Sequence, residues 1–190
     1  MTNANDRGAE LYRAYLDGDS EAFETLVGLY RENVIFFCLR YLSVFEDAED
    51  AAAEAFAALI INPTRYDFKT AFKTYLFSIA KKKAVDIYRK RARLASVDAV
   101  TDSEWAETIE ASVLAEEEKR ELHRALASLP ADYGTVLHLV YFEELSCAEA
   151  ASVMGKTKKQ TENLLYRAKK TLRTRLEDGS APKGNRYEIK

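Results

Sequence analysis

The chain has 190 residues, with 28 basic and 31 acidic side chains and a net charge of −3. This length suits one medium domain or two small ones. No apolar run is long enough to span a membrane and no signal peptide opens the chain, so we expect a cytoplasmic protein without membrane insertion.

The composition favours an all-α architecture, because seven glycines and three prolines punctuate a chain rich in Ala, Leu, Glu and Lys. The charges are unevenly distributed. Residues 81–93 hold seven basic side chains and one acid, residues 156–175 hold eight and one, and the remainder holds 13 basic against 29 acidic. Two basic surfaces in an acidic body indicate two contacts with nucleic acid.

The first predicted helices are amphipathic. Residues 1–8 are polar and are expected to fray. A short helix is predicted over residues 11–16, ended by the Asp-Gly-Asp-Ser sequence that starts at Asp17. Apolar residues then recur at helical spacing from Phe23 to Tyr41, which predicts a longer helix with one buried face.

An acidic helix is predicted next, over residues 47–61, with Asp47 as its cap. Acids near a helix start complement the helix dipole. An exposed acidic cluster would equally suit docking of a basic partner, and position alone leaves both interpretations open. The acids in question are Glu46, Asp47, Glu49, Asp50 and Glu54.

A loop over residues 64–70 follows Asn62-Pro63 and leads to a helix predicted over residues 71–92, aromatic at its start and basic at its end. Aromatic faces stack on bases while cations neutralise phosphates, so this combination suits single-stranded nucleic acid. Phe72 and Ile79 fit a core stripe better. The candidates for base contact are Tyr66, Phe68 and Tyr75, and those for the flanking phosphates are Lys81, Lys82, Arg89, Lys90 and Arg91.

Residues 94–118 are rich in Asp, Glu, Ser and Ala and predict an interdomain linker, with Trp105 as its large apolar side chain. A helical pattern resumes at residue 119, and Pro130 marks the start of a helix that carries Val136 and Tyr141. The tail, residues 178–190, is expected to be flexible.

Two helices joined by a tight turn are predicted over residues 145–176. Ser146 with Glu149 and Thr157 with Gln160 have the spacing of capping boxes, and Gly155 supplies the turn between them. The second helix has a predicted buried stripe of Thr161, Leu164, Leu165, Ala168, Leu172 and Leu176. Its predicted outward residues are Lys158, Lys159, Gln160, Asn163, Tyr166, Arg167 and Lys170.

The pattern favours a DNA-reading helix-turn-helix over a solvated lysine-rich helix, since amide and fork-shaped donors suit base edges and phosphates in a major groove. By contrast, the cysteine and histidine residues predict neither a catalytic site nor a metal site. Cys38, Cys147, His123 and His138 share no metal-ligand spacing and lie among apolar helical positions. We therefore expect no catalytic residue, no metal site and no cofactor.

Taken together, these stretches resemble the extracytoplasmic-function (ECF) group of sigma factors in the sigma-70 family. DGDSEAFETLVGLY is similar to the start of the family's region two, and DAEDAAAEAF to its polymerase-docking segment. FKTYLFSIAKKKAVDIYRKRAR resembles the segment that melts the promoter and recognises the −10 element, with Asp86 and Arg89 at matching places. The stretch from LASLPADYG to YRAKKTL resembles region four, which reads the −35 element.

The resemblance implies two helical domains: a region-two domain over residues 9–93 and a region-four domain over residues 119–177. It also implies a protein that is not itself an enzyme, that recruits core RNA polymerase to promoter DNA and that is controlled by an anti-sigma factor. Docking is expected at Asp47, Glu49, Asp50 and Glu54, and the free chain is expected to be monomeric. The chain departs from the usual residues at Ala53, Tyr75, Lys82 and Thr161.

Two other classes of function remain as alternatives. One is an autonomous helix-turn-helix regulator whose amino-terminal domain senses a signal or dimerises, which would require a ligand pocket or a dimer face. The other is an enzyme acting on nucleic acid, which would require clustered acids near the basic helices. Asp86 is the one acid within the first basic run, which counts against the enzyme.

Overall fold

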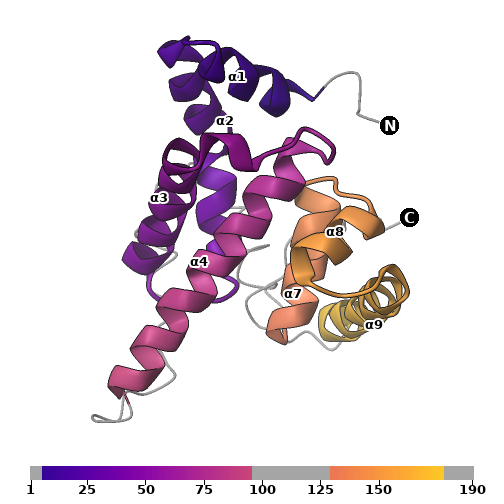
Figure 1. Ribbon diagram of the computed structural model, residues 1–190. Coiled ribbons are helices and arrows are strands. Elements are labelled where there is room, and N and C mark those ends of the chain that lie inside the picture. Colours follow the sequence, from indigo (N-terminus) through magenta and orange to yellow (C-terminus); the bar gives the residue numbers. More distant parts are fainter. Residues whose placement is uncertain (1–5, 96–128, 178–190) are drawn as a thin grey trace.

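The computed structural model describes residues 6–95 and 129–177, which form helices and turns without a strand in those ranges (Figure 1). The predicted all-α class is therefore confirmed. The elements are α1 (Arg7–Leu16), α2 (Ser20–Cys38), α3 (Phe45–Ile61), η1 (Pro63–Arg65), α4 (Phe72–Ala95), α7 (Ala131–Leu137), η2 (His138–Phe142), α8 (Cys147–Met154) and α9 (Lys158–Glu177). None of these helices is long and apolar enough to cross a bilayer.

The start of α1 differs from the prediction. The helix begins at Arg7 rather than residue 11, because Asp6 caps it: the Asp6 Oδ1 atom accepts a hydrogen bond from the Ala9 amide at 3.1 Å. The Asp6 Oδ2 atom also accepts one from the Phe72 amide at 2.7 Å. One carboxylate thus serves the first turns of α1 and α4, two helices far apart in the sequence.

Helix α1 approaches α2 and α4 closely at Gly8. A Cβ atom there would lie 2.6 Å from the Phe72 ring and 2.7 Å from the Tyr30 hydroxyl, so only glycine fits without movement. Tyr12, fully buried on the same helix, donates hydrogen bonds to the Leu59 and Pro63 carbonyls at 2.9 and 3.1 Å. The Leu59 carbonyl lies in the last turn of α3, where intrahelical donors run out, and the Pro63 carbonyl lies at the start of η1.

Helices α2, α3 and α4 form the body of the amino-terminal half (Figure 1). Leu26, Phe37, Leu59 and Phe77 are fully buried in its core. The Asn62-Pro63 break is confirmed. The predicted cap of α3 is wrong: Val44 occupies the N-cap position, without a side-chain hydrogen bond, and Asp47 lies inside the helix.

Pro130 lies directly before α7, as expected. After α7, residues 138–142 form a π-helix. The Glu143 amide there donates to the carbonyl five residues earlier, that of His138, at 3.2 Å. Glu144 follows with φ +58°, a left-handed conformation that is uncommon for a residue with a Cβ atom.

The two halves share one hydrophobic core. Helix α8 packs on α4 (Figure 1). The His138 ring lies 5.8 Å from the Phe37 ring and 6.5 Å from the Phe77 ring. Helix α4 continues to Ala95, three residues further than predicted. The rest of the predicted linker with Trp105, the helical pattern up to residue 128, which includes His123, and the tail lie outside the described residues.

Candidate nucleic-acid interface

The turn between α8 and α9 has the predicted caps. The Ser146 hydroxyl accepts from the Glu149 amide at 3.3 Å, and the Glu149 carboxylate accepts from the Ser146 amide at 2.9 Å. Gly155 takes the left-handed conformation at φ +68°. In the second box, the Thr157 and Gln160 amides each donate to the other residue's side chain, at 2.8 and 3.2 Å.

Helix α9 divides into the two predicted faces. Of the predicted stripe, Thr161, Ala168 and Leu172 are buried, Leu164 and Leu165 are half-buried, and the side chain of Leu176 lies outside the described part of the chain. The Thr161 hydroxyl donates to the Thr157 carbonyl at 3.1 Å, so its polar atom is satisfied within the helix. The opposite face is exposed, with Tyr166 70% accessible. We call this exposed set the α9 face: Lys158, Lys159, Gln160, Asn163, Tyr166, Arg167 and Lys170.

Most of the predicted basic residues of α4 are also exposed. Lys82, Asp86, Arg89, Lys90 and Arg91 all face solvent on the second half of the helix, and we call them the α4 face. Sequence reasoning missed Tyr88, which is 58% exposed beside Arg89. An aromatic residue at a position outside the helix's apolar stripe was the signal that could have identified it.

Lys81 does not join the α4 face. Its Nζ atom donates to the Met154 carbonyl of α8 at 2.6 Å, and burial lowers the pKa of its amine. The side chain therefore bridges the two halves in this structure rather than extending into solvent.

The aromatic residues before α4 form a cluster around Tyr12. The Tyr66 ring is only 3% exposed, stacks on Tyr75 with 4.9 Å between centroids, and donates its hydroxyl to the Thr70 carbonyl at 2.7 Å. Burial also raises the pKa of Tyr66. The proposed base contact by Tyr66 is thus not available in this conformation, since its ring belongs to the core.

Phe68 and Tyr75 are half-buried at the edge of that cluster. The Phe68 ring lies 4.5 Å from the Tyr66 ring, carries the Arg13 guanidinium at 4.6 Å from its centroid, and sits at a left-handed φ of +59°. Each keeps part of its surface accessible, so these two remain candidates for base contact.

The acids of α3 are mostly engaged within the chain. Asp47 is buried and forms an ion pair with Arg91 of the α4 face, so its carboxylate is not exposed to a docking partner in this structure. Glu49 pairs with Arg31 at 2.6 Å and Glu54 with Lys83 at 2.9 Å. Asp50 is exposed one turn after Glu46, which is exposed too.

Cys38 and His138 occupy buried positions, as expected, whereas Cys147 at the start of α8 is only partly buried. Cys38 is fully buried, which raises the pKa of its thiol, and His138 is 2% exposed among aromatic rings. In the ranges 6–95 and 129–177, no three His, Cys, Asp or Glu side chains gather as a metal site.

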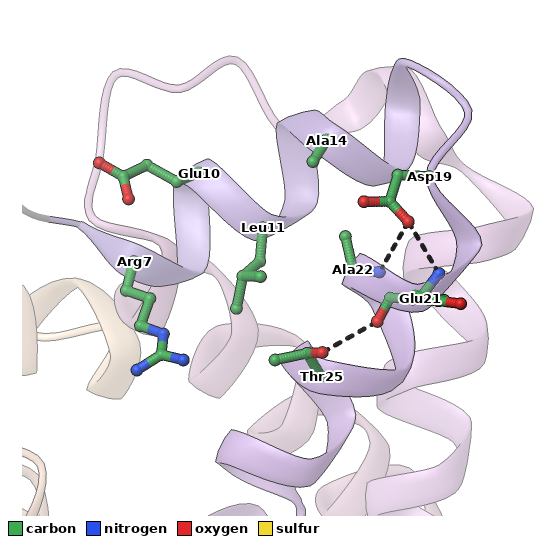
Figure 2. A pocket seen from close by; sticks show the side chains of 8 residues that line it. All are labelled: Arg7, Glu10, Leu11, Ala14, Asp19, Glu21, Ala22 and Thr25. Atoms are coloured by element: carbon green, nitrogen blue, oxygen red, sulfur yellow. Dashed lines mark hydrogen bonds between the residues drawn. The ribbon is translucent and has the colours of Figure 1, made fainter.

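A shallow hollow between α1 and α2 is lined by Leu11 together with small and charged side chains (Figure 2). Its Asp19 carboxylate caps α2 through the Glu21 and Ala22 amides, and the Thr25 hydroxyl donates to the Glu21 carbonyl. These hydrogen bonds stabilise the first turn of α2. No nucleophile lies next to a general base among the residues that line the hollow.

Comparison with known proteins identifies both halves. The family model "Sigma-70 region 2" matches residues 26–94 and "Sigma-70, region 4" matches residues 119–172, together about two thirds of the chain. The chain is 28% identical to the ECF RNA polymerase sigma factor SigW of Bacillus subtilis over 174 residues, 85% of this chain and 92% of that protein. It is 27% identical to the ECF sigma factor SigF of Caulobacter vibrioides over 183 residues, covering 93% and 97%.

Solved structures show the same fold. CnrH, in complex with the cytosolic domain of CnrY, matches with a TM-score of 0.64 at 23% identity, covering 92% of this chain and 99% of CnrH. The sigma factor RpoE, in complex with the anti-sigma factor NepR from Bartonella quintana, matches with a TM-score of 0.64 at 19% identity, covering 82% and 96%. From its two region models and its relatives, the chain belongs to the ECF group of the sigma-70 family of transcription initiation factors.

Proposed function

We propose that this chain binds core RNA polymerase, directs it to particular promoters and stabilises the opened strand, without catalysing a reaction itself. The observation that carries the proposal is the α9 face. Two capped helices hold it rigidly, and it presents amide, guanidinium, ammonium and phenol groups to solvent without an internal role for most of them.

The two basic faces have different tasks in this proposal. The α9 face enters the major groove of the upstream element, where Asn163 reads a base edge and Lys159 and Arg167 contact phosphates. The α4 face holds the downstream element, where Lys82, Arg89, Lys90 and Arg91 neutralise phosphates of the opened strand. Phe68, Tyr75 and Tyr88 supply aromatic surface for its bases.

Docking on polymerase is assigned to the accessible acids of α3, chiefly Asp50 with Glu46 and Glu54. Glu49 and Glu54 have basic partners on neighbouring helices, so contact with a basic surface of polymerase would exchange one partner for another. The sigma factor RpoE has the same fold as this chain, and its solved complex with the anti-sigma factor NepR supports regulation by an anti-sigma factor.

DNA selection by the reconstituted holoenzyme tests the role of α9. Duplex sites are selected from a random library by polymerase carrying wild type, Asn163→Ala or Lys159→Ala. We expect Asn163→Ala to lose preference at one base position, by about 1–3 kcal/mol for a good base contact. Lys159→Ala should weaken all sequences alike, because a phosphate contact carries no sequence information.

The control is Arg7→Ala, which removes an exposed positive charge from α1, away from both faces. It should leave both the preference and the affinity unchanged. Identical selected sequences for Asn163→Ala and wild type would show that this side chain does not read DNA.

A further inference from the structure

An ion pair joins one cation of the α4 face to the first turn of α3. The Arg91 Nη2 atom donates a hydrogen bond to Asp47 Oδ1, and Asp47 is buried at 7% exposure. Acidic side chains are almost never buried unless they are paired, so the contact with Arg91 accounts for the position of Asp47. The Arg91 side chain is nonetheless 55% exposed, so the pair does not remove it from solvent.

The packing of α3 against α4 brings these two residues together. The helices lie side by side, and one face of α4 turns towards the core, with Ala84 buried and Ile87 half-buried (Figure 1). Arg91 comes one turn after Ile87, so it continues that face to the point where α3 begins. A second ion pair, Glu54 with Lys83 at 2.9 Å, lies about two turns away along both helices. Helix packing therefore sets the position of the arginine.

The other cations of the α4 face lack this support. Among the residues that the structure describes, Lys82, Arg89 and Lys90 form no ion pair. A long basic side chain loses rotamer freedom when it binds a phosphate group, and this loss weakens binding. The pair with Asp47 restricts Arg91 before DNA arrives. A guanidinium has five N–H donors in a fixed fork, so donors remain for a nucleic-acid oxygen.

We propose that Asp47 is a positioning residue that orients the Arg91 guanidinium for contact with the opened promoter strand. Asp47 is buried and acidic, so it acts through Arg91 and not on a phosphate group itself. An acid on the helix that carries the docking surface thereby contributes to DNA binding. The inference rests on the proposed function, because it requires the α4 face to hold the downstream element.

Two substitutions of Asp47 separate orientation from charge. Asp47→Asn keeps an oxygen acceptor at the same place and Asp47→Ala removes it, while both lose the same negative charge. The lost charge changes the electrostatic attraction to DNA equally in the two variants. A difference between them therefore reports the hydrogen bond to Arg91. Each substitution is made in the wild-type chain and in Arg91→Ala, where no guanidinium is left to orient.

DNA binding by the polymerase holoenzyme provides the first test. Core polymerase with each full-length variant is bound to forked DNA from a promoter mapped by transcription, with the non-template strand of the downstream element unpaired. We expect Asp47→Ala to bind about two- to tenfold more weakly than Asp47→Asn, the range for immobilising one long side chain. In the Arg91→Ala background the two variants should bind equally. Affinity for core polymerase and helix content by circular dichroism should not differ between them.

NMR relaxation of the guanidinium Nε–H groups provides a second test, in the free wild-type chain without any substitution. We expect Arg91 to be rigid and Arg89 to be mobile on the picosecond-to-nanosecond timescale. Equal mobility of these two arginines would overturn the proposal. Equal DNA affinity of Asp47→Ala and Asp47→Asn, or a difference that persists in Arg91→Ala, would overturn it as well. Wild-type holoenzyme that does not bind the fork would contradict the proposed function and, with it, this inference.

Discussion

At the scale of single residues, Asp6 stabilises the starts of two helices that lie far apart in the sequence. Its two carboxylate oxygens accept hydrogen bonds from the first turns of α1 and α4. Loss of an N-cap costs about 0.5–2 kcal/mol, so we expect Asp6→Ala to lower the free energy of unfolding by about 1–3 kcal/mol. Urea unfolding followed by circular dichroism measures this change.

Asp17→Ala is the matched control, because it removes an exposed carboxylate from the other end of α1. It should change stability by at most a few tenths of a kcal/mol. Equal stability of Asp6→Ala and Asp17→Ala would show that the double cap contributes nothing.

Sequence reasoning succeeded where a residue's role depends on its near neighbours in the chain. The capping pairs around Gly155 and the two faces of α9 follow from spacing alone, and both are confirmed. Sequence reasoning failed where the interacting residue is distant in the sequence. The spacing of Asp47 could not reveal Arg91, 44 residues later, and the aromatic character of Tyr66 could not reveal that Tyr12 and Tyr75 cover its ring.

At the scale of elements, the π-helix and Glu144 fix the position of the His138–Glu143 pair. Burial lowers the pKa of His138 below its ordinary 6.5, opposed by Glu143, while Arg40 and Lys73 add to the lowering. Burial alone would raise the pKa of Glu143, but the hydrogen bond from His138 and the charges of His138 and Lys73 hold it below its ordinary 4.5.

The pair makes stability fall with acidification. Below about pH 6.5 the unfolded chain takes up a proton at His138 that the folded chain resists, so stability declines as pH falls. Glu143 extends the loss below about pH 4.5, because the folded carboxylate also resists protonation. Each of the two groups changes the free energy of unfolding by at most about 1.4 kcal/mol per pH unit.

Urea unfolding of wild type and His138→Phe at pH 7.5, 6.5 and 5.5 measures the contribution of His138. Both proteins keep His123, so the difference between their slopes isolates the buried imidazole. We expect the stability of wild type to decline more steeply with falling pH than that of the variant. Parallel curves would contradict this assignment.

At the scale of the whole molecule, the sequence predicted two helical halves but not their contact. Amphipathic spacing identifies which face of a helix is buried, but it does not identify the element against which that face packs. Lys81 was predicted to contact phosphates, and no role was predicted for Lys73 or Glu143, whereas in the structure these residues join α4 to the other half. The α4 face and the α9 face are exposed in the structure, but Lys81 of the first basic run is held by the end of α8, which charge patterning could not predict.

The most direct test of the account is transcription with purified components. Core RNA polymerase, the chain and genomic DNA of its source organism are combined, and the 5′ ends of the transcripts are mapped. The account predicts discrete start sites that require the chain and disappear when Lys159, Asn163, Tyr166 and Arg167 are all replaced by alanine. No chain-dependent start sites, with polymerase that is active with another sigma factor, would contradict it.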